Sequence, residues 1–113
     1  MRSSQKTRTS EAERALGRFS DPALLVMASL ADGPKHGHAM IADIAQMSGT
    51  RLGPGTLYGA IARLEEQGLI EPLPPKDRRY PYRLTPGGER VLRAKLNTLH
   101  QFTLAGLSKL EAS

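Results

Sequence analysis

Apolar residues recur at helical spacing in three consecutive segments of the chain. Residues 23–31 form an almost continuous apolar run. Residues 37–47 carry apolar side chains three and four positions apart, which places them on one face of a helix. A third segment, 54–67, opens on Pro54, a residue suited to a first helical turn, and repeats the same spacing. The pattern predicts three helices that share one core.

Two short strands and a long helix should follow these helices. Residues 69–73 and 80–84 are rich in strand-forming residues, and the second segment alternates between two faces. The proline-rich and charged segment 74–79 lies between them as a turn. Thr85 is a suitable N-cap for a helix that extends to about Leu110. The sequence therefore predicts a mainly α fold with a small β-ribbon.

The last predicted helix carries more apolar surface than so small a protein can cover. Most of its large apolar residues fall within one stripe at helical spacing, and the residues assigned to this surface are Leu92, Leu96, Leu99, Phe102, Thr103, Leu107 and Leu110. A chain of 113 residues has little core left to cover it. A second copy of the chain is the economical partner, which predicts a homodimer. A small cavity lined by Phe102, Leu99 and Met27 is the alternative use of this surface.

Composition narrows the class of protein. The formal charge of +5 and a pI of about 10.0 favour a polyanionic partner, although residues 20–68 are net acidic. The chain has no cysteine, which fits a reducing cytoplasm and excludes thiolate chemistry. No apolar run is long enough to span a bilayer, so we expect no membrane association. Residues 1–9 are polar and basic and are expected to form a disordered arm, before a short helix over 11–18.

Four motifs follow one another in a diagnostic order. They are Gly33-Pro34-Lys35-His36-Gly37, Pro54-Gly55-Thr56-Leu57-Tyr58, the segment from Arg63 to Ile70, and the segment from Tyr82 to Gly88. With them the chain resembles the PadR family of bacterial transcriptional regulators, in its short form with a single C-terminal helix. The resemblance implies a winged helix-turn-helix domain over 20–86, a basic arm with a short helix over 1–19, and a C-terminal dimerisation helix over 87–113.

The resemblance also implies a function. It indicates a homodimeric, nucleoid-associated repressor that binds a near-palindromic duplex through the third helix and a basic wing. Hydroxyls near the start of that helix, and cations in the wing, would reach phosphates and base edges. The expected DNA contacts are Lys35, His36, Arg51, Pro54, Gly55, Thr56, Tyr58, Arg63, Lys76, Arg78, Arg79 and Tyr80. Capping residues and an ordinary solvated turn are the alternative interpretation of these positions.

Catalysis and metal binding find no support in the sequence. His36 and His38 do not share a helical face, and His100 lies far from both. The neighbouring Glu65 and Glu66 point about 100° apart on a helix, which is typical of a solvated surface. We therefore expect neither an enzyme nor a cofactor. Two alternatives to DNA readout stay open, a protein-interaction module on the same scaffold and a sensor of an unidentified small-molecule effector.

Overall fold

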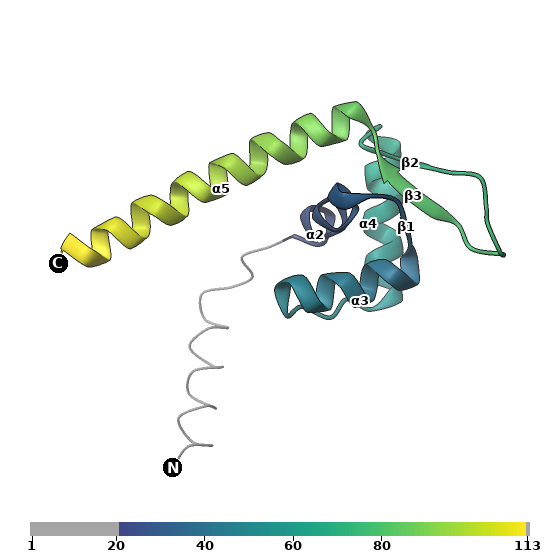
Figure 1. The fold of residues 1–113 in the computed structure, drawn as a ribbon, viewed down its shortest axis with the longest axis horizontal. Helices are drawn as coiled ribbons and strands as arrows, with labels where there is room; N and C mark the ends of the chain where they lie inside the picture. The colour runs from purple at the N-terminus through teal and green to yellow at the C-terminus, as the bar shows by residue number, and fades with distance from the viewer. Residues whose placement is uncertain (1–20, 113) are drawn as a thin grey trace, which may run out of the picture.

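A computed structural model describes residues 21–112 of the chain (Figure 1). Three short helices gather into one body, a small sheet lies beside them, and one long helix projects away from the body. In chain order the elements are α2 (Pro22–Ser29), a 3₁₀ turn (Leu30–Asp32), β1 (Lys35–His36), α3 (Gly37–Ser48), α4 (Pro54–Glu66), β2 (Ile70–Pro72), β3 (Pro81–Leu84) and α5 (Pro86–Ala112). The expected N-terminal arm and the helix over 11–18 lie outside the described residues.

The helices begin where the capping residues predicted. The Asp21 carboxylate accepts a hydrogen bond of 2.7 Å from the backbone N–H of Ala23, and a proline opens α2. Pro54 likewise occupies the first turn of α4. At the start of α5 the Thr85 hydroxyl accepts from the N–H of Gly88 at 2.9 Å. These local contacts explain why the starts of α2, α4 and α5 could be predicted to within a residue.

The core lies where the three helices, β2 and the start of α5 meet. Val26, Met40, Ile44 and Leu57 have no exposed surface, and Ile61 and Leu64 are almost as deeply buried. The full set of buried apolar residues is Leu25, Val26, Met27, Leu30, Met40, Ile44, Leu52, Leu57, Ala60, Ile61, Leu64, Ile70 and Leu92. This confirms the prediction that the apolar spacing of α4 faces the core.

The sheet has one strand more than the sequence indicated. The expected ribbon of β2 and β3 is present, and β1 pairs with the other edge of β3, in the order β1-β3-β2. Both pairings are antiparallel, with Lys35 opposite Tyr82 and Ile70 opposite Leu84. A strand of two residues is too short to show alternation, so nothing local announces β1. It ties the start of α3 to the wing.

The first turns of α5 belong to the body of the protein. Gly88 is buried, and a Cβ at this position would overlap the backbone carbonyl oxygen of Leu69. Leu92 is 4% exposed and packs in the core. The expectation that Leu92 lies in a dimer interface is therefore corrected, since the chain's own helices and sheet already cover it. Leu96, Phe102 and Leu107, farther along α5, are exposed.

Candidate nucleic-acid interface

Helix α4 divides cleanly into a buried face and an exposed face. Leu57, Ala60, Ile61 and Leu64 face the core. The other face begins with small and polar residues, and Tyr58 there is 51% exposed. The exposed residues predicted to contact DNA on this helix are Pro54, Gly55, Thr56, Tyr58 and Arg63. A backbone with such small side chains can approach a flat or grooved partner closely.

The wing ends in a tight turn that carries its cations. Lys76 and Arg79 exchange two backbone hydrogen bonds of 2.9 Å. Between them Asp77 and Arg78 adopt φ angles of 52° and 65°, the left-handed conformation that two-residue hairpin turns require. This conformation is uncommon outside glycine. Lys76, Arg78, Arg79 and Tyr80 are all exposed at this end of the wing.

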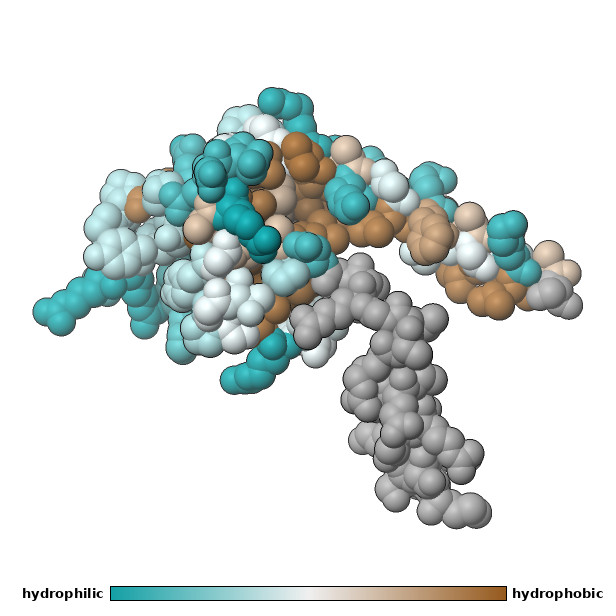
Figure 2. Space-filling model, turned by 180° about the vertical axis from the view of Figure 1, so that it is seen from behind, coloured by the Kyte–Doolittle hydropathy of each residue, from teal (hydrophilic) through white to brown (hydrophobic). Residues whose placement is uncertain are grey.

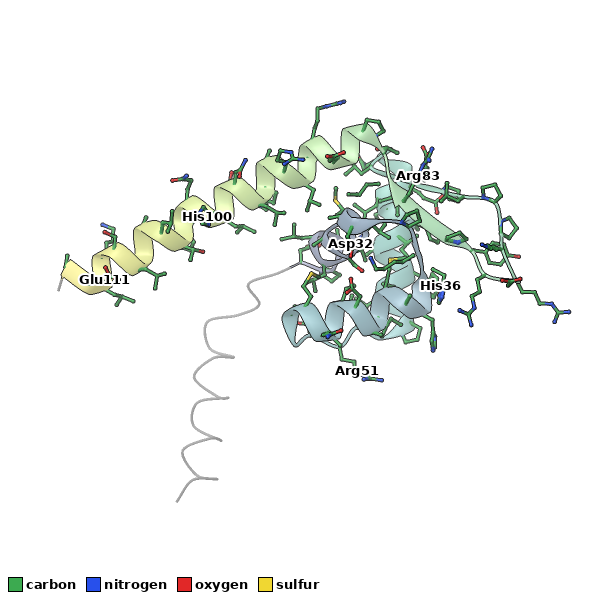
Figure 3. The ribbon with its side chains drawn as sticks, in the orientation of Figure 1. Asp32, His36, Arg51, Arg83, His100 and Glu111 are labelled. Atoms are coloured by element: carbon green, nitrogen blue, oxygen red, sulfur yellow. The ribbon has the colours of Figure 1, made fainter. Side chains whose placement is uncertain are left out.

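A hollow of about 370 Å³ lies between the wing, the start of α3 and the exposed face of α4. It is lined by His36, Gly37, His38, Tyr58, Arg78, Arg79, Tyr80 and Tyr82. Within it Nη1 of Arg79 lies 3.0 Å from Nε2 of His36, which sits at the beginning of α3 facing the wing (Figure 3). The structure thus brings together five of the predicted DNA contacts, which come from three separate elements.

Three residues of the hollow were missed by the sequence reasoning. A Cβ at Gly37 would overlap the end of the Tyr58 side chain, so the tyrosine lies directly against the start of α3. Tyr82 shares a strand face with Tyr80, and that alternation was the available signal. Burial, with smaller contributions from Glu65 and Tyr58, raises the pKa of the Tyr82 phenol. From the sequence, His38 was considered only as a candidate metal ligand.

Lys35 points into its own chain instead of into the hollow. Its ammonium donates to the backbone oxygen of Ser29 and to the Asp32 carboxylate, and lies 3.9 Å from the carboxylate of Asp43. The Ser29 hydroxyl donates to the same Asp43 carboxylate at 2.6 Å. The Lys35 side chain is 19% exposed, and it lowers the pKa of Asp32 by hydrogen bonding and charge. Its predicted contact with DNA stays a prediction, whereas its contacts within the chain are structural.

Replacing Lys35 with methionine should therefore lower stability. The change leaves Asp43 without its cation in a half-buried position, which should cost about 1–3 kcal/mol of unfolding free energy in urea. Lys76→Met, in the exposed turn of the wing, should cost less than about 0.5 kcal/mol. Equal stabilities of the two variants, together with a weaker salt dependence of DNA binding for Lys35→Met, would assign Lys35 to DNA instead.

The other predicted contacts lie outside the hollow. Arg51 is exposed in the loop before α4, and its side chain points away from the body below α3 (Figure 3). Arg63 is exposed near the end of α4, and Lys76 lies within the wing turn. These side chains could reach a long polymer at separate points, but they could not share one small ligand with His36.

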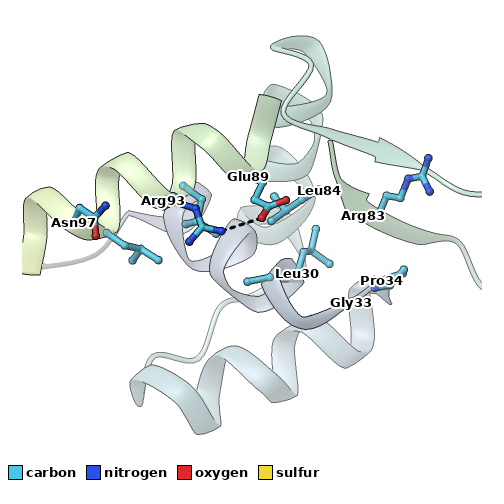
Figure 4. A pocket seen from close by; sticks show the side chains of 11 residues that line it. Leu30, Gly33, Pro34, Arg83, Leu84, Glu89, Arg93 and Asn97 are labelled. Carbon is cyan, nitrogen blue, oxygen red and sulfur yellow. Dashed lines mark hydrogen bonds and ion pairs between the residues drawn. The ribbon is translucent and has the colours of Figure 1, made fainter. Parts of the chain in front are cut away.

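A larger cavity, of about 550 Å³, opens beside α5 (Figure 4). The 3₁₀ turn, β3 and the first half of α5 form its walls. Its lining mixes apolar side chains, which are Leu30, Leu84, Leu92 and Leu96, with polar ones, which are Arg83, Glu89, Arg93 and Asn97. An ion pair of 3.0 Å between Arg93 and Glu89 also borders it. Neither Phe102 nor Met27 lines it, so it differs from the small cavity that the sequence suggested as an alternative.

Within residues 21–112, no three His, Asp or Glu side chains gather closely enough to hold a metal ion. No helix in that range is both long and apolar enough to cross a bilayer.

A helical core, an exposed third helix and an adjoining wing define the winged helix-turn-helix class of proteins. Similarity to known proteins supports the same class. Residues 26–94 match the family model described as "Transcriptional regulator PadR-like family". The chain belongs to this family, whose model is described as one of transcriptional regulators.

Solved structures and one curated relative resemble the chain. A PadR family transcriptional regulator from Eggerthella lenta is 30% identical, with a TM-score of 0.67 and 95% of each chain covered. A transcriptional regulator from Clostridium thermocellum is 26% identical, with a TM-score of 0.67 over 78% of this chain and 87% of that one. An uncharacterized 37.1 kDa protein in transposon TN4556 of Streptomyces fradiae is 50% identical over 82 residues. These residues are 73% of this chain and about a quarter, 24%, of that relative.

Proposed function

We propose that the protein is a homodimeric repressor that binds a near-palindromic DNA operator through α4 and the wing. One observation carries the proposal: the exposed face of α4 and the cationic turn of the wing converge on one hollow that no carboxylate lines. A duplex presents a groove flanked by regularly spaced phosphates, which matches a small-residue helix beside a cationic loop. The protein would act in the cytoplasm, at the nucleoid.

In this proposal α4 enters the major groove. Gly55 and Thr56 occupy its first turn, where backbone N–H groups and the positive end of the helix face the phosphates. Tyr58 and Arg63 follow on the exposed side of the same helix. Arg78 would extend from the wing toward the adjacent minor groove, where arginine suits a narrow and strongly negative channel.

The dimer would form along the projecting part of α5. This helix has 27 residues and is therefore about 40 Å long, and its apolar surface continues from the body toward the C-terminus (Figure 2). Phe102 is 75% exposed and Leu107 is 53% exposed. The remaining expected contacts are Leu96, Leu99, Thr103 and Leu110. Leu96 also lines the larger cavity, so the proposed interface would adjoin a cavity in which an effector could bind.

Selection from random duplexes tests the proposal most directly. Enrichment of a two-fold symmetric sequence with half-sites about one helical turn apart is expected, since a symmetric dimer places two α4 helices in successive major grooves. The repressor role is then tested with a reporter gene controlled by this sequence, whose expression the protein should lower. If no sequence is enriched while the protein retains a stoichiometric protein partner, it is an interaction module instead.

Cations of the wing should govern the salt dependence of binding. For the Arg78→Ala, Arg79→Ala double variant, the slope of log affinity against log salt should fall by about one unit per lost phosphate contact. The measurement is fluorescence anisotropy of the selected duplex across a salt series. Arg90→Ala, which removes an exposed cation from α5, is the matched control and should leave the slope unchanged. A flat salt dependence of the unaltered protein would contradict the DNA-binding role of the wing.

A further inference from the structure

His36 makes two contacts that its imidazole cannot satisfy together. Its Nδ1 accepts from the backbone N–H of Ala39 at 3.3 Å, which caps α3, and its Nε2 lies 3.0 Å from Nη1 of Arg79. A guanidinium can only donate, and a neutral imidazole has one donor nitrogen and one acceptor nitrogen. If Nδ1 accepts, Nε2 carries the hydrogen. Two N–H donors then face each other across 3.0 Å.

An acceptor that both donors could reach from one side would remove the conflict. The alternative tautomer, with hydrogen on Nδ1, would accept from Arg79 but would lose the hydrogen bond to Ala39. No carboxylate is among the residues that line the hollow around this pair. The side chains that do line it are two histidines, two arginines and three tyrosines. A hollow with this lining favours an anion.

Tyr58 completes the arrangement from a third element. Its side chain lies against Gly37, immediately after His36 in the chain, because that position has no Cβ. The Tyr58 side chain therefore lies against the start of α3, and Tyr58 and His36 line the same hollow. The hollow measures about 370 Å³, which is roomier than a single ion needs and leaves space for the sugar that follows a backbone phosphate.

We propose that this hollow holds one phosphodiester group of the DNA backbone, to which His36 Nε2–H and the guanidinium of Arg79 donate together. The proposal rests on the proposed function and adds to it that the two residues share one phosphate instead of binding two. His36 keeps its cap on α3 in the bound state, so the wing and the helix-turn-helix are fastened to the same point of the duplex. Tyr58 donates its hydroxyl at the edge of the site.

The test combines neutral phosphates with two variants. Methylphosphonate is placed at one backbone position at a time in both halves of the selected duplex, which removes the charge of that phosphate. At one of these positions, methylphosphonate should lower the affinity of the unaltered protein about tenfold. His36→Asn retains a residue that caps helices but is too short to reach the phosphate, and Arg79→Gln removes the charge. Each should lose about tenfold on the unmodified duplex and become insensitive to methylphosphonate at that position.

Lys76→Gln is the matched control, because Lys76 is a cation of the same turn outside the hollow. It should remain sensitive at the position that His36→Asn and Arg79→Gln no longer sense. Thermal melts of all three variants should superimpose on that of the unaltered protein, which separates a lost contact from a lost fold.

Several outcomes would overturn the shared phosphate. If the affinity losses caused by His36→Asn and by methylphosphonate multiplied at every backbone position, the two residues would share no phosphate. DNA binding itself would be unaffected by that result. If the unaltered protein bound no duplex, the proposed function would fail as a whole. Inorganic phosphate, added at constant ionic strength, should shift the His36 ring resonances only at millimolar concentrations. Saturation at micromolar concentrations would assign the hollow to a free anion instead.

Discussion

Gly88→Ala should strongly destabilise the protein. The added Cβ would overlap the carbonyl oxygen of Leu69, and this backbone atom cannot rotate away as a side chain could. That carbonyl also accepts the N–H of Thr85 at 3.1 Å, so moving it disturbs the junction between β3 and α5. We expect a loss of about 3 kcal/mol or more in the free energy of unfolding, measured in urea. This is a large share of what a domain of this size possesses.

Gly87→Ala is the matched control and should have the opposite effect. The nearest atoms to its added Cβ are 3.8 Å away, which is ordinary contact. Alanine in a helical turn is favoured over glycine, so the free energy of unfolding should rise by about 0.5–1 kcal/mol. If the two variants were equally stable, the close packing of α5 on Leu69 would be wrong.

Charges on the apolar side of α5 should convert the dimer to a monomer. The variant Phe102→Glu, Leu107→Glu places carboxylates on two exposed residues that the proposed dimer buries. Sedimentation velocity should show a monomer. Affinity for the selected palindrome should fall at least about a hundredfold, because a monomer cannot bind both half-sites at once. The body should stay folded, since neither residue contributes to the core.

Gln101→Glu, Ser108→Glu is the control, with the same charge change one residue away from each site. Gln101 and Ser108 lie on the opposite side of the helix, so this variant should remain dimeric and bind with little change. Equal loss in both variants would point to a general effect of negative charge near DNA. A dimer that survives Phe102→Glu, Leu107→Glu would place the interface elsewhere in the chain.

Elements with local signals could be predicted well from the sequence. Helix α4 was expected over 54–67 and lies over Pro54–Glu66, because its proline start and its apolar spacing are both local features. Strand β1 has no such signal, since two residues form it by pairing with β3 more than forty positions later. Periodicity also placed Leu92 and Leu107 on one stripe without distinguishing them. Packing separates the two, because Leu92 is covered by its own chain and Leu107 is not.

By itself, the sequence determined the order of the helices and the wing, the face of α4 that is buried, and the family. Each of these follows from residue spacing and motifs, which are properties of neighbouring positions. Only the tertiary structure decided that Lys35 turns inward to Asp32 and Asp43, and that the wing returns to place Arg79 beside His36. Contacts between residues 43 positions apart depend on how β3 pairs with β1, and no local pattern encodes that pairing.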